Sequence, residues 1–154
     1  MGEVRVKVTL TNAVDEAMAR RGQISSDKIR IYQTDALIDT GAVRSIIPVH
    51  LLQLLGLEIR GQRVAEYADG RKENVGVTEP IIFELEKRDT LEEALVLGDE
   101  VIIGQTVLEK LDLFVDCTHK RLIPNPAHPD QPVSKVKKTN FLYHFSIHHR
   151  QTHR

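Results

Sequence analysis

The sequence predicts a mostly-β domain, and three features support this fold class. Apolar and polar residues alternate from Val4 to Leu10, which is the period-2 pattern of a strand with one buried face. An Asp-Gly pair at Asp69–Gly70 divides two longer apolar stretches, as in a β-hairpin. Short apolar runs then recur and predict strands within residues 28–38, 57–67, 74–86, 94–97, 101–103, 113–116 and 121–123.

Two short helices are expected among these strands. Pro48 suits the first turn of a helix over residues 48–55, and Gly56 suits its C-terminal cap. The stretch from Thr106 to Glu109 has the Thr-x-x-Glu spacing of a capping box, which predicts the start of a second helix. The fold class is therefore a mostly-β domain with one or two short helices.

Two polar stretches are predicted as connections. Residues 11–27 end in Gly22 and a Ser-Ser pair, so they are expected to form a loop that has room for a helical turn over 14–20. Residues 86–93 are rich in charge and are expected to link two strands without forming one.

Length and composition indicate a single globular domain. The chain has 154 residues, 41% hydrophobic and 28% charged, which suits one buried core and excludes a wholly disordered chain. No apolar run approaches the roughly 18 residues of a membrane span, and the N-terminus does not resemble a signal peptide. A lone cysteine, Cys117, excludes an internal disulfide and a cysteine-cage zinc site. A cytoplasmic location is the simplest interpretation.

The C-terminal part differs in composition from the rest. Four prolines follow the last predicted strand, so the domain is expected to cover residues 1–124, with a basic, His-rich tail at 125–154. Residues 131–154 carry a formal charge of +5, and the remaining 130 residues carry −6. The apolar residues of the tail could bind to the body of the domain or to a neighbour, and the sequence does not choose between these: Phe141, Leu142, Tyr143, Phe145 and Ile147.

The chemistry is expected at Asp39-Thr40-Gly41. This tripeptide lies between two apolar stretches, where a carboxylate is costly unless it is hydrogen-bonded, paired or shared. Thr40 offers a hydroxyl, and Gly41 permits a close backbone approach. Taken alone, the tripeptide also fits an ordinary Asp-containing turn.

A wider pattern resembles the retropepsin-like aspartic proteases, in particular the single-lobe bacterial and cellular members. Residues 36–42, Ala-Leu-Ile-Asp-Thr-Gly-Ala, and residues 45–48, Ser-Ile-Ile-Pro, match the active-site segment of that family. The family's second motif, an apolar strand that ends in Gly and precedes a short helix, is matched by Ile102, Ile103 and Gly104. The resemblance covers roughly residues 30–123 and implies a single-lobe acid protease fold, a closed β-barrel-like lobe with a flap hairpin.

The resemblance implies an aspartic endopeptidase that works without a metal or organic cofactor. One Asp-Thr-Gly is half of the catalytic pair, so Asp39 would act in a homodimer on a peptide or protein substrate. Thr40 would hold the two loops together across the axis, while Gly41 and Ala42 would line the substrate groove. The family's flap, which closes over the substrate, would be formed by Tyr67, Ala68, Asp69, Gly70 and Arg71.

Departures and rival interpretations accompany this hypothesis. Arg44 and Gln105 stand where viral members often have an acid and an arginine, so that ion pair is absent or replaced. A catalytically inactive dimerisation or peptide-binding module is the alternative function, because fold does not fix function.

Other side-chain groups have weaker functional interpretations. Cys117 and His119 fit a turn better than a nucleophile and its base, because no third catalytic residue accompanies them. Nucleic-acid binding by the basic tail is not expected, nor is a metal site built from its histidines, His144, His148, His149 and His153.

Overall fold

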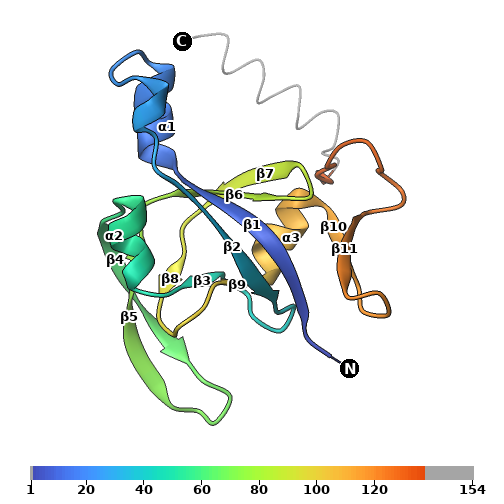
Figure 1. Ribbon diagram of the computed structural model, residues 1–154. Coiled ribbons are helices and arrows are strands. Elements are labelled where there is room, and N and C mark those ends of the chain that lie inside the picture. Colours follow the sequence, from blue (N-terminus) through green and yellow to red (C-terminus); the bar gives the residue numbers. More distant parts are fainter. Residues whose placement is uncertain (1, 138–154) are drawn as a thin grey trace, which may run out of the picture.

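The computed structural model describes residues 2–137, which form eleven strands, three α-helices and a 3₁₀ turn. Nine of these strands form one curled sheet in the order β4-β5-β8-β3-β9-β2-β1-β6-β7, and β10 pairs with β11 (Figure 1). The predicted mostly-β fold is confirmed. Within the described residues, the strand order leaves β4 and β7 as the two edges of the sheet.

The longest ladder within the sheet is an antiparallel pair, β1 (Val4–Asn12) and β2 (Ile31–Ile38). Strand β1 also pairs with β6 (Ile81–Leu85), so both of its edges are hydrogen-bonded. Val8 and Leu10 are fully buried, as the alternation at the N-terminus predicts. The pairing with β1 fixes the position of β2 and therefore of Asp39, which directly follows it.

The connection between β1 and β2 is more ordered than expected. It contains α1 (Ala13–Arg20), a helix of eight residues, and the 3₁₀ turn η1 (Ser26–Lys28), which together project from the body (Figure 1). The Asn12 side chain caps α1 by accepting the Asp15 N–H, so a full helix forms where the sequence suggested a loop with one turn. Asn12 is a favourable N-cap residue and could have indicated the start of this helix, but the segment as a whole is polar and was therefore interpreted as a loop.

An ion pair holds this projection in place. The Arg30 guanidinium donates two hydrogen bonds to the Asp15 carboxylate, at 2.8 and 2.9 Å, and thereby lowers the pKa of Asp15. Asn12 also donates to the Leu55 carbonyl at 2.7 Å. The base of α1 is therefore tied to both β2 and the helix that ends at Leu55.

Helix α2 (His50–Leu55) confirms the first predicted helix. Pro48 lies two residues before it, and Gly56 ends it in the left-handed conformation with φ at 63°. A short strand, β3 (Ile46–Ile47), precedes this helix and pairs with the middle of the sheet.

The predicted hairpin is formed by β4 (Ile59–Glu66) and β5 (Lys72–Thr78). The second predicted strand, residues 74–86, is two strands in the structure, because the chain breaks at Pro80 between β5 and β6. Proline cannot donate to a strand ladder, which explains the break. The two halves lie at different ends of the sheet.

The expectation of an unpaired connection at residues 86–93 is wrong. Glu86 and Lys87 form a two-residue turn with positive φ at both positions, and β7 (Arg88–Glu92) pairs back onto β6. The two end residues of this strand are charged and yet buried: the Arg88 guanidinium donates to three backbone carbonyls, and Glu92 pairs with Lys110 at 3.0 Å. These distant partners are invisible in the local sequence.

The remaining elements follow the predicted order. They are β8 (Leu95–Val96), β9 (Ile102–Ile103), α3 (Gln105–Leu111), β10 (Leu113–Asp116) and β11 (Arg121–Pro124). One apolar core joins the sheet to α2 and α3, and its largest fully buried side chains include Phe83, Leu10, Ile47, Leu51 and Leu111. Among residues 2–137 there is no helix of the length and apolarity that a membrane crossing requires.

The segment after β11 contacts the domain. The Asp112 carboxylate accepts hydrogen bonds from Asn125, from the His128 ring and from the Val133 N–H. These bonds, the one from Asn125 first, lower the pKa of Asp112. Residues 125–133 are therefore attached at the end of α3, whereas the tail histidines and the apolar residues from Phe141 onward lie outside the described residues.

Candidate active site

Strands β2 and β9 place Asp39 at the end of the central sheet. They are parallel neighbours, with Leu37 opposite Ile102 and Ile38 opposite Ile103. The Asp39 N–H continues this pairing by donating to the Ile103 carbonyl at 3.0 Å. The two apolar stretches that the sequence showed before Asp39 and before Gly104 are therefore side by side.

The turn at Asp39 holds its carboxylate in a defined direction. The Gly41 N–H donates to Asp39 Oδ1 at 3.0 Å, and the Ala42 N–H donates to the Asp39 carbonyl at 3.1 Å. Asp39, Thr40 and Gly41 are exposed in the single chain. The site thus presents a carboxylate that is positioned by the backbone and is open to a partner.

The segment that begins at Asp39 (the Asp39 loop, residues 39–45) is fastened to the start of α3. The Gln105 N–H donates to the Ala42 carbonyl at 2.7 Å, and both the N–H and the hydroxyl of Thr106 donate to the Val43 carbonyl. Three donors from α3 therefore meet two adjacent carbonyls of the loop. The loop is fixed by groups some 60 positions away in the sequence.

Gly104 packs directly against this loop. A Cβ atom at this position would lie 2.6 Å from the Arg44 carbonyl oxygen and 2.9 Å from the Ala42 carbonyl oxygen. The Gly104 N–H donates to the hydroxyl of Ser45, which is fully buried, at 2.9 Å. Glycine is required here because two backbones meet, with no room for a side chain.

The capping-box prediction for α3 is wrong. Helix α3 begins at Gln105, its N-cap is Gly104, and the cap makes no side-chain hydrogen bond. The Thr106 hydroxyl contacts Val43 and Glu92 instead. A local pattern cannot reveal this, because both partners come from elsewhere in the chain.

An ion pair links the Asp39 loop to Glu93. Arg44 lies 3.6 Å from the Glu93 carboxylate and donates to the Glu93 carbonyl at 3.3 Å. The arginine is on the loop, and the acid is on the segment between β7 and β8. The half-buried Arg44 therefore adds a further tie to the loop.

The hairpin predicted as the flap is built largely from its own contacts. The Tyr67 hydroxyl donates to Glu73, which raises the pKa of Tyr67, and the Arg71 guanidinium lies 4.4 Å from the Tyr67 ring centroid. Gly70 has a φ of 86°, as its turn requires. In Figure 1 the β2 arrow ends in the lower part of the body, and the β4–β5 hairpin projects from the body toward the bottom of the picture.

A hollow of about 360 Å³ adjoins Asp39. It is lined by the N-terminal segment, the end of β2 and the β10–β11 hairpin, including Glu3, Thr40, Val115 and Cys117. Cys117 is exposed, and His119 pairs with Asp116 instead of with the thiol. Within residues 2–137 no three His, Cys, Asp or Glu side chains are grouped to hold a metal ion.

The structure thus brings together the Asp39 loop and Ile102–Gly104. It gives Ser45, which belongs to the matched active-site segment, a partner in the Gly104 N–H. It adds Thr106, to which the sequence pattern assigned no role at the site, because the position of its hydroxyl depends on the tertiary fold.

The fold is similar to that of known retroviral-type proteases. The retroviral protease-like domain of Ddi1 from Leishmania major matches with a TM-score of 0.52 and 19% identity, over 82% of this chain and 90% of that chain. EIAV protease complexed with the inhibitor HBY-793 matches with a TM-score of 0.42 and 20% identity, over 50% of this chain and 75% of that chain. No family model and no curated protein sequence matches the chain. The chain has a retropepsin-like fold.

Proposed function

We propose that the chain is an aspartic endopeptidase that hydrolyses peptide bonds as a homodimer, with one Asp39 from each copy. The observation that carries this proposal is the exposed Asp39 carboxylate, which the Gly41 N–H orients within a loop fastened to Gly104 and α3. A carboxylate held so firmly at an open surface is suited to chemistry with a second group. The retropepsin-like fold agrees with this role.

The second copy is proposed because of the single active-site tripeptide. The sequence contains one Asp-Thr-Gly, so the second carboxylate of the catalytic pair is assigned to a second copy of the chain. A two-fold axis beside Asp39 brings identical surfaces together, and the hollow next to Asp39 and Thr40 offers space for the partner. In this arrangement Thr40 contacts its counterpart across the axis.

The proposed mechanism uses the shared charge of the two Asp39 carboxylates. Two carboxylates a few ångströms apart hold one proton between them, because both cannot ionise readily. The ionised carboxylate takes a proton from a bound water, which attacks the carbonyl carbon of the peptide bond. The protonated carboxyl donates its proton to the carbonyl oxygen. As the tetrahedral intermediate collapses, the carboxyl that took the water proton passes it to the leaving nitrogen, and the other carboxylate takes a proton from a hydroxyl of the intermediate. The C–N bond breaks, which releases the amine and the acid with one proton again shared by the two carboxylates.

The other residues support this chemistry. Ile102, Ile103 and Gly104 form the rigid wall behind the loop, and Gly41 and Ala42 line the groove in which the peptide lies. Residues 67–71, at the turn of the β4–β5 hairpin, cover the substrate. The catalytic domain is proposed to span residues 1–124, followed by the basic segment from 125 to 154.

The proposal is tested with a peptide-library cleavage assay from acidic to neutral pH. Asp39→Asn is expected to reduce the cleavage rate by about 10³-fold or more, because it removes the general base and the shared proton. The matched control, Asp35→Asn, alters an exposed carboxylate on β2 and should retain activity. Equal cleavage by wild type and Asp39→Asn would refute the assignment.

Mixing experiments test the dimer. In a re-equilibrated one-to-one mixture of wild type and Asp39→Asn, random pairing leaves about a quarter of the dimers with two carboxylates. Activity should therefore fall to about a quarter of that of the same total amount of wild type, whereas independent monomers would retain half. A folded wild-type dimer that cleaves nothing would favour the inactive binding module.

A further inference from the structure

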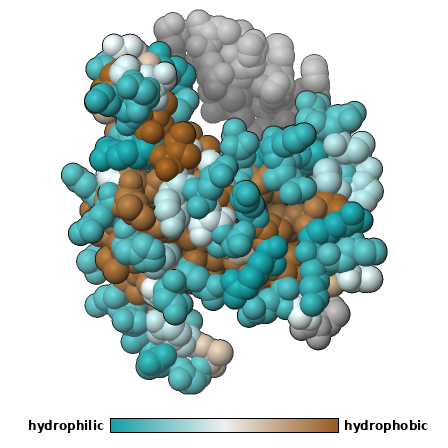
Figure 2. All heavy atoms as spheres, viewed as in Figure 1, coloured by the Kyte–Doolittle hydropathy of each residue, from teal (hydrophilic) through white to brown (hydrophobic). Residues whose placement is uncertain are grey.

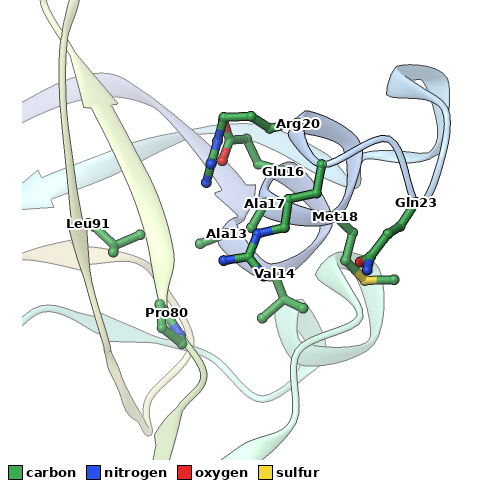
Figure 3. Close-up of a pocket in the computed structure, with 10 residues that line it drawn as sticks. Ala13, Val14, Glu16, Ala17, Met18, Arg20, Gln23, Pro80 and Leu91 are labelled. Carbon is green, nitrogen blue, oxygen red and sulfur yellow. The ribbon is translucent and has the colours of Figure 1, made fainter.

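A groove lies between α1 and the strands β6 and β7, away from Asp39. Figure 3 shows Pro80 and Leu91 on one side, facing Val14 and Ala17 of α1 on the other. The groove has a volume of about 380 Å³. It is the space that remains between α1 and the part of the sheet that carries Pro80 and Leu91.

The walls of this groove are unusually apolar for an exposed surface. Val14 is 39% exposed and Leu91 is 52% exposed, although both are large hydrophobic residues. Figure 2 shows apolar surface where the α1 projection meets the body. Of the charged residues at the rim, Glu16 and Arg20 pair with each other at 3.6 Å, and Arg21 adds a positive charge. The walls therefore suit an apolar segment that brings no further positive charge.

The chain carries such a segment beyond the described residues. Phe141, Tyr143, Phe145 and Ile147 occupy alternate positions, so an extended conformation would place all four on one face. From residue 141 to 147 there is no Lys, Arg, Asp or Glu, whereas basic residues flank the segment on both sides. This pattern has the length and polarity of a strand that binds along one apolar surface.

The segment after β11 is attached at the start of β7, the strand that contributes Leu91 to the groove. The Arg88 guanidinium donates to the His128 carbonyl at 2.9 Å, which attaches the segment after β11 to the start of this strand. Leu91 lies three residues further along β7, or about 10 Å at the rise of a strand. The described chain ends at residue 137, and the four residues from 138 to 141 can extend up to about 14 Å beyond that end.

We propose that residues 141–147 bind in the groove between α1 and β6–β7 of the same chain, with Phe141, Tyr143, Phe145 and Ile147 against its apolar walls. The segment then joins α1 to the sheet and covers Val14 and Leu91. It occupies a surface separate from Asp39, so the proposal stands whether or not the chain cleaves peptides.

The test is cross-linking in the full chain. In a Cys117→Ser background, Leu91→Cys is combined with Phe145→Cys, and a short bismaleimide is added to dilute protein. The matched control combines Val64→Cys with Phe145→Cys, because Val64 is 62% exposed on the β4–β5 hairpin, far from α1 in Figure 1. We expect an intramolecular product at least tenfold faster for the Leu91 pair.

Two outcomes would overturn the proposal. Equal cross-linking rates for the Leu91 and Val64 pairs would show that the tail has no preferred surface. A product that forms only between chains, in proportion to protein concentration, would assign the groove to a second copy instead.

Backbone hydrogen exchange provides an independent measurement on the same protein. Amides of α1 should exchange at least several-fold faster in a Phe141→Ser, Phe145→Ser variant than in the wild type, while amides of the β4–β5 hairpin stay unchanged. Unchanged exchange in α1 would contradict the proposal.

Discussion

The Asp39 loop is stabilised in a different way from α1 and the β4–β5 hairpin, the two elements that project from the body. Backbone carbonyls of the loop accept from Gln105 and Thr106, and the buried Ser45 hydroxyl accepts from Gly104, all of which are distant in sequence. The projections depend on carboxylates instead: Asp15 anchors α1, and Glu73 contacts Tyr67 in the β4–β5 hairpin. Apart from the Arg44–Glu93 ion pair, the Asp39 loop is thus held by backbone and hydroxyl groups, whereas α1 and the β4–β5 hairpin depend on carboxylates.

The largest effect is expected where the loop meets the second backbone. Gly104→Ala forces a Cβ to within 2.6 Å of the Arg44 carbonyl oxygen, and a backbone atom cannot move aside as a side-chain end can. We expect a loss of about 1–3 kcal/mol in the free energy of unfolding, measured by urea denaturation. Cleavage should fall with it, because the Asp39 loop must shift.

The matched control for this prediction is Gly61→Ala in the β4–β5 hairpin. A Cβ at Gly61 meets nothing within 4 Å, so the change should stay within about 0.5 kcal/mol. If both variants lost the same stability, close packing at Gly104 would not distinguish the loop from the hairpin.

A smaller loss is expected from Ser45→Ala. The change removes the only acceptor of the buried Gly104 N–H within the described residues, and we expect a loss of about 1 kcal/mol, the lower end of the cost of an unsatisfied donor, because the smaller side chain leaves room for water. Ser25→Ala removes a hydroxyl that bonds to Asp27 at an exposed site and should leave stability nearly unchanged. Thermal denaturation of the two variants, side by side, measures the difference; equal melting temperatures would contradict it.

Acid should destabilise α1 and the β10–β11 turn at a higher pH than it destabilises the Asp39 loop. The His119 ring and then Arg121 hold the pKa of Asp116 at about 2, below its ordinary 3.8, and Arg30 likewise lowers the pKa of Asp15. Because both pKa values are lower in the folded chain, the stabilisation is present above the ordinary pKa and declines as pH falls below it; for Asp116 it is lost as pH falls toward 2. Hydrogen exchange at pH 3 should accelerate in α1 and in the β10–β11 turn more than in residues 103–106.

The control for the acid prediction is Asp116→Asn. This variant should be less stable than the wild type at neutral pH and should converge with it at pH 2, in urea denaturation curves. A constant difference across that range would show that the carboxylate is not paired in the folded chain.

The smallest effect is expected from Tyr67→Phe. The hydroxyl bonds to Glu73 within the exposed hairpin, and the ring that Arg71 covers is retained, so stability should change by no more than about 0.5 kcal/mol. Peptide cleavage should also persist, since the hydroxyl is already engaged. A loss of cleavage comparable to that of Asp39→Asn would show that this hydroxyl acts on the substrate.

Prediction from sequence succeeded where local patterns are sufficient. The alternation in β1, the Asp-Gly turn and the Gly56 cap each depend on neighbouring residues, and all three were confirmed. It failed at β7, because the charges of Arg88 and Glu92 conceal a strand whose buried ends are satisfied by α3 and by the segment after β11. It also failed at Thr106, whose hydroxyl turns to the Asp39 loop.

The sequence by itself determined the strand-rich fold, the position of Asp39 at the end of an apolar strand, and the single Asp-Thr-Gly from which the homodimer is proposed. Only the tertiary structure decided which groups support Asp39: β9 beside β2, Ser45 beneath Gly104, and Arg44 against Glu93. It also decided that α1 leaves an apolar groove against β7. The physical reason is that periodicity records which face of an element is buried, whereas hydrogen-bond partners 50 or more positions apart are set only when the sheet is assembled.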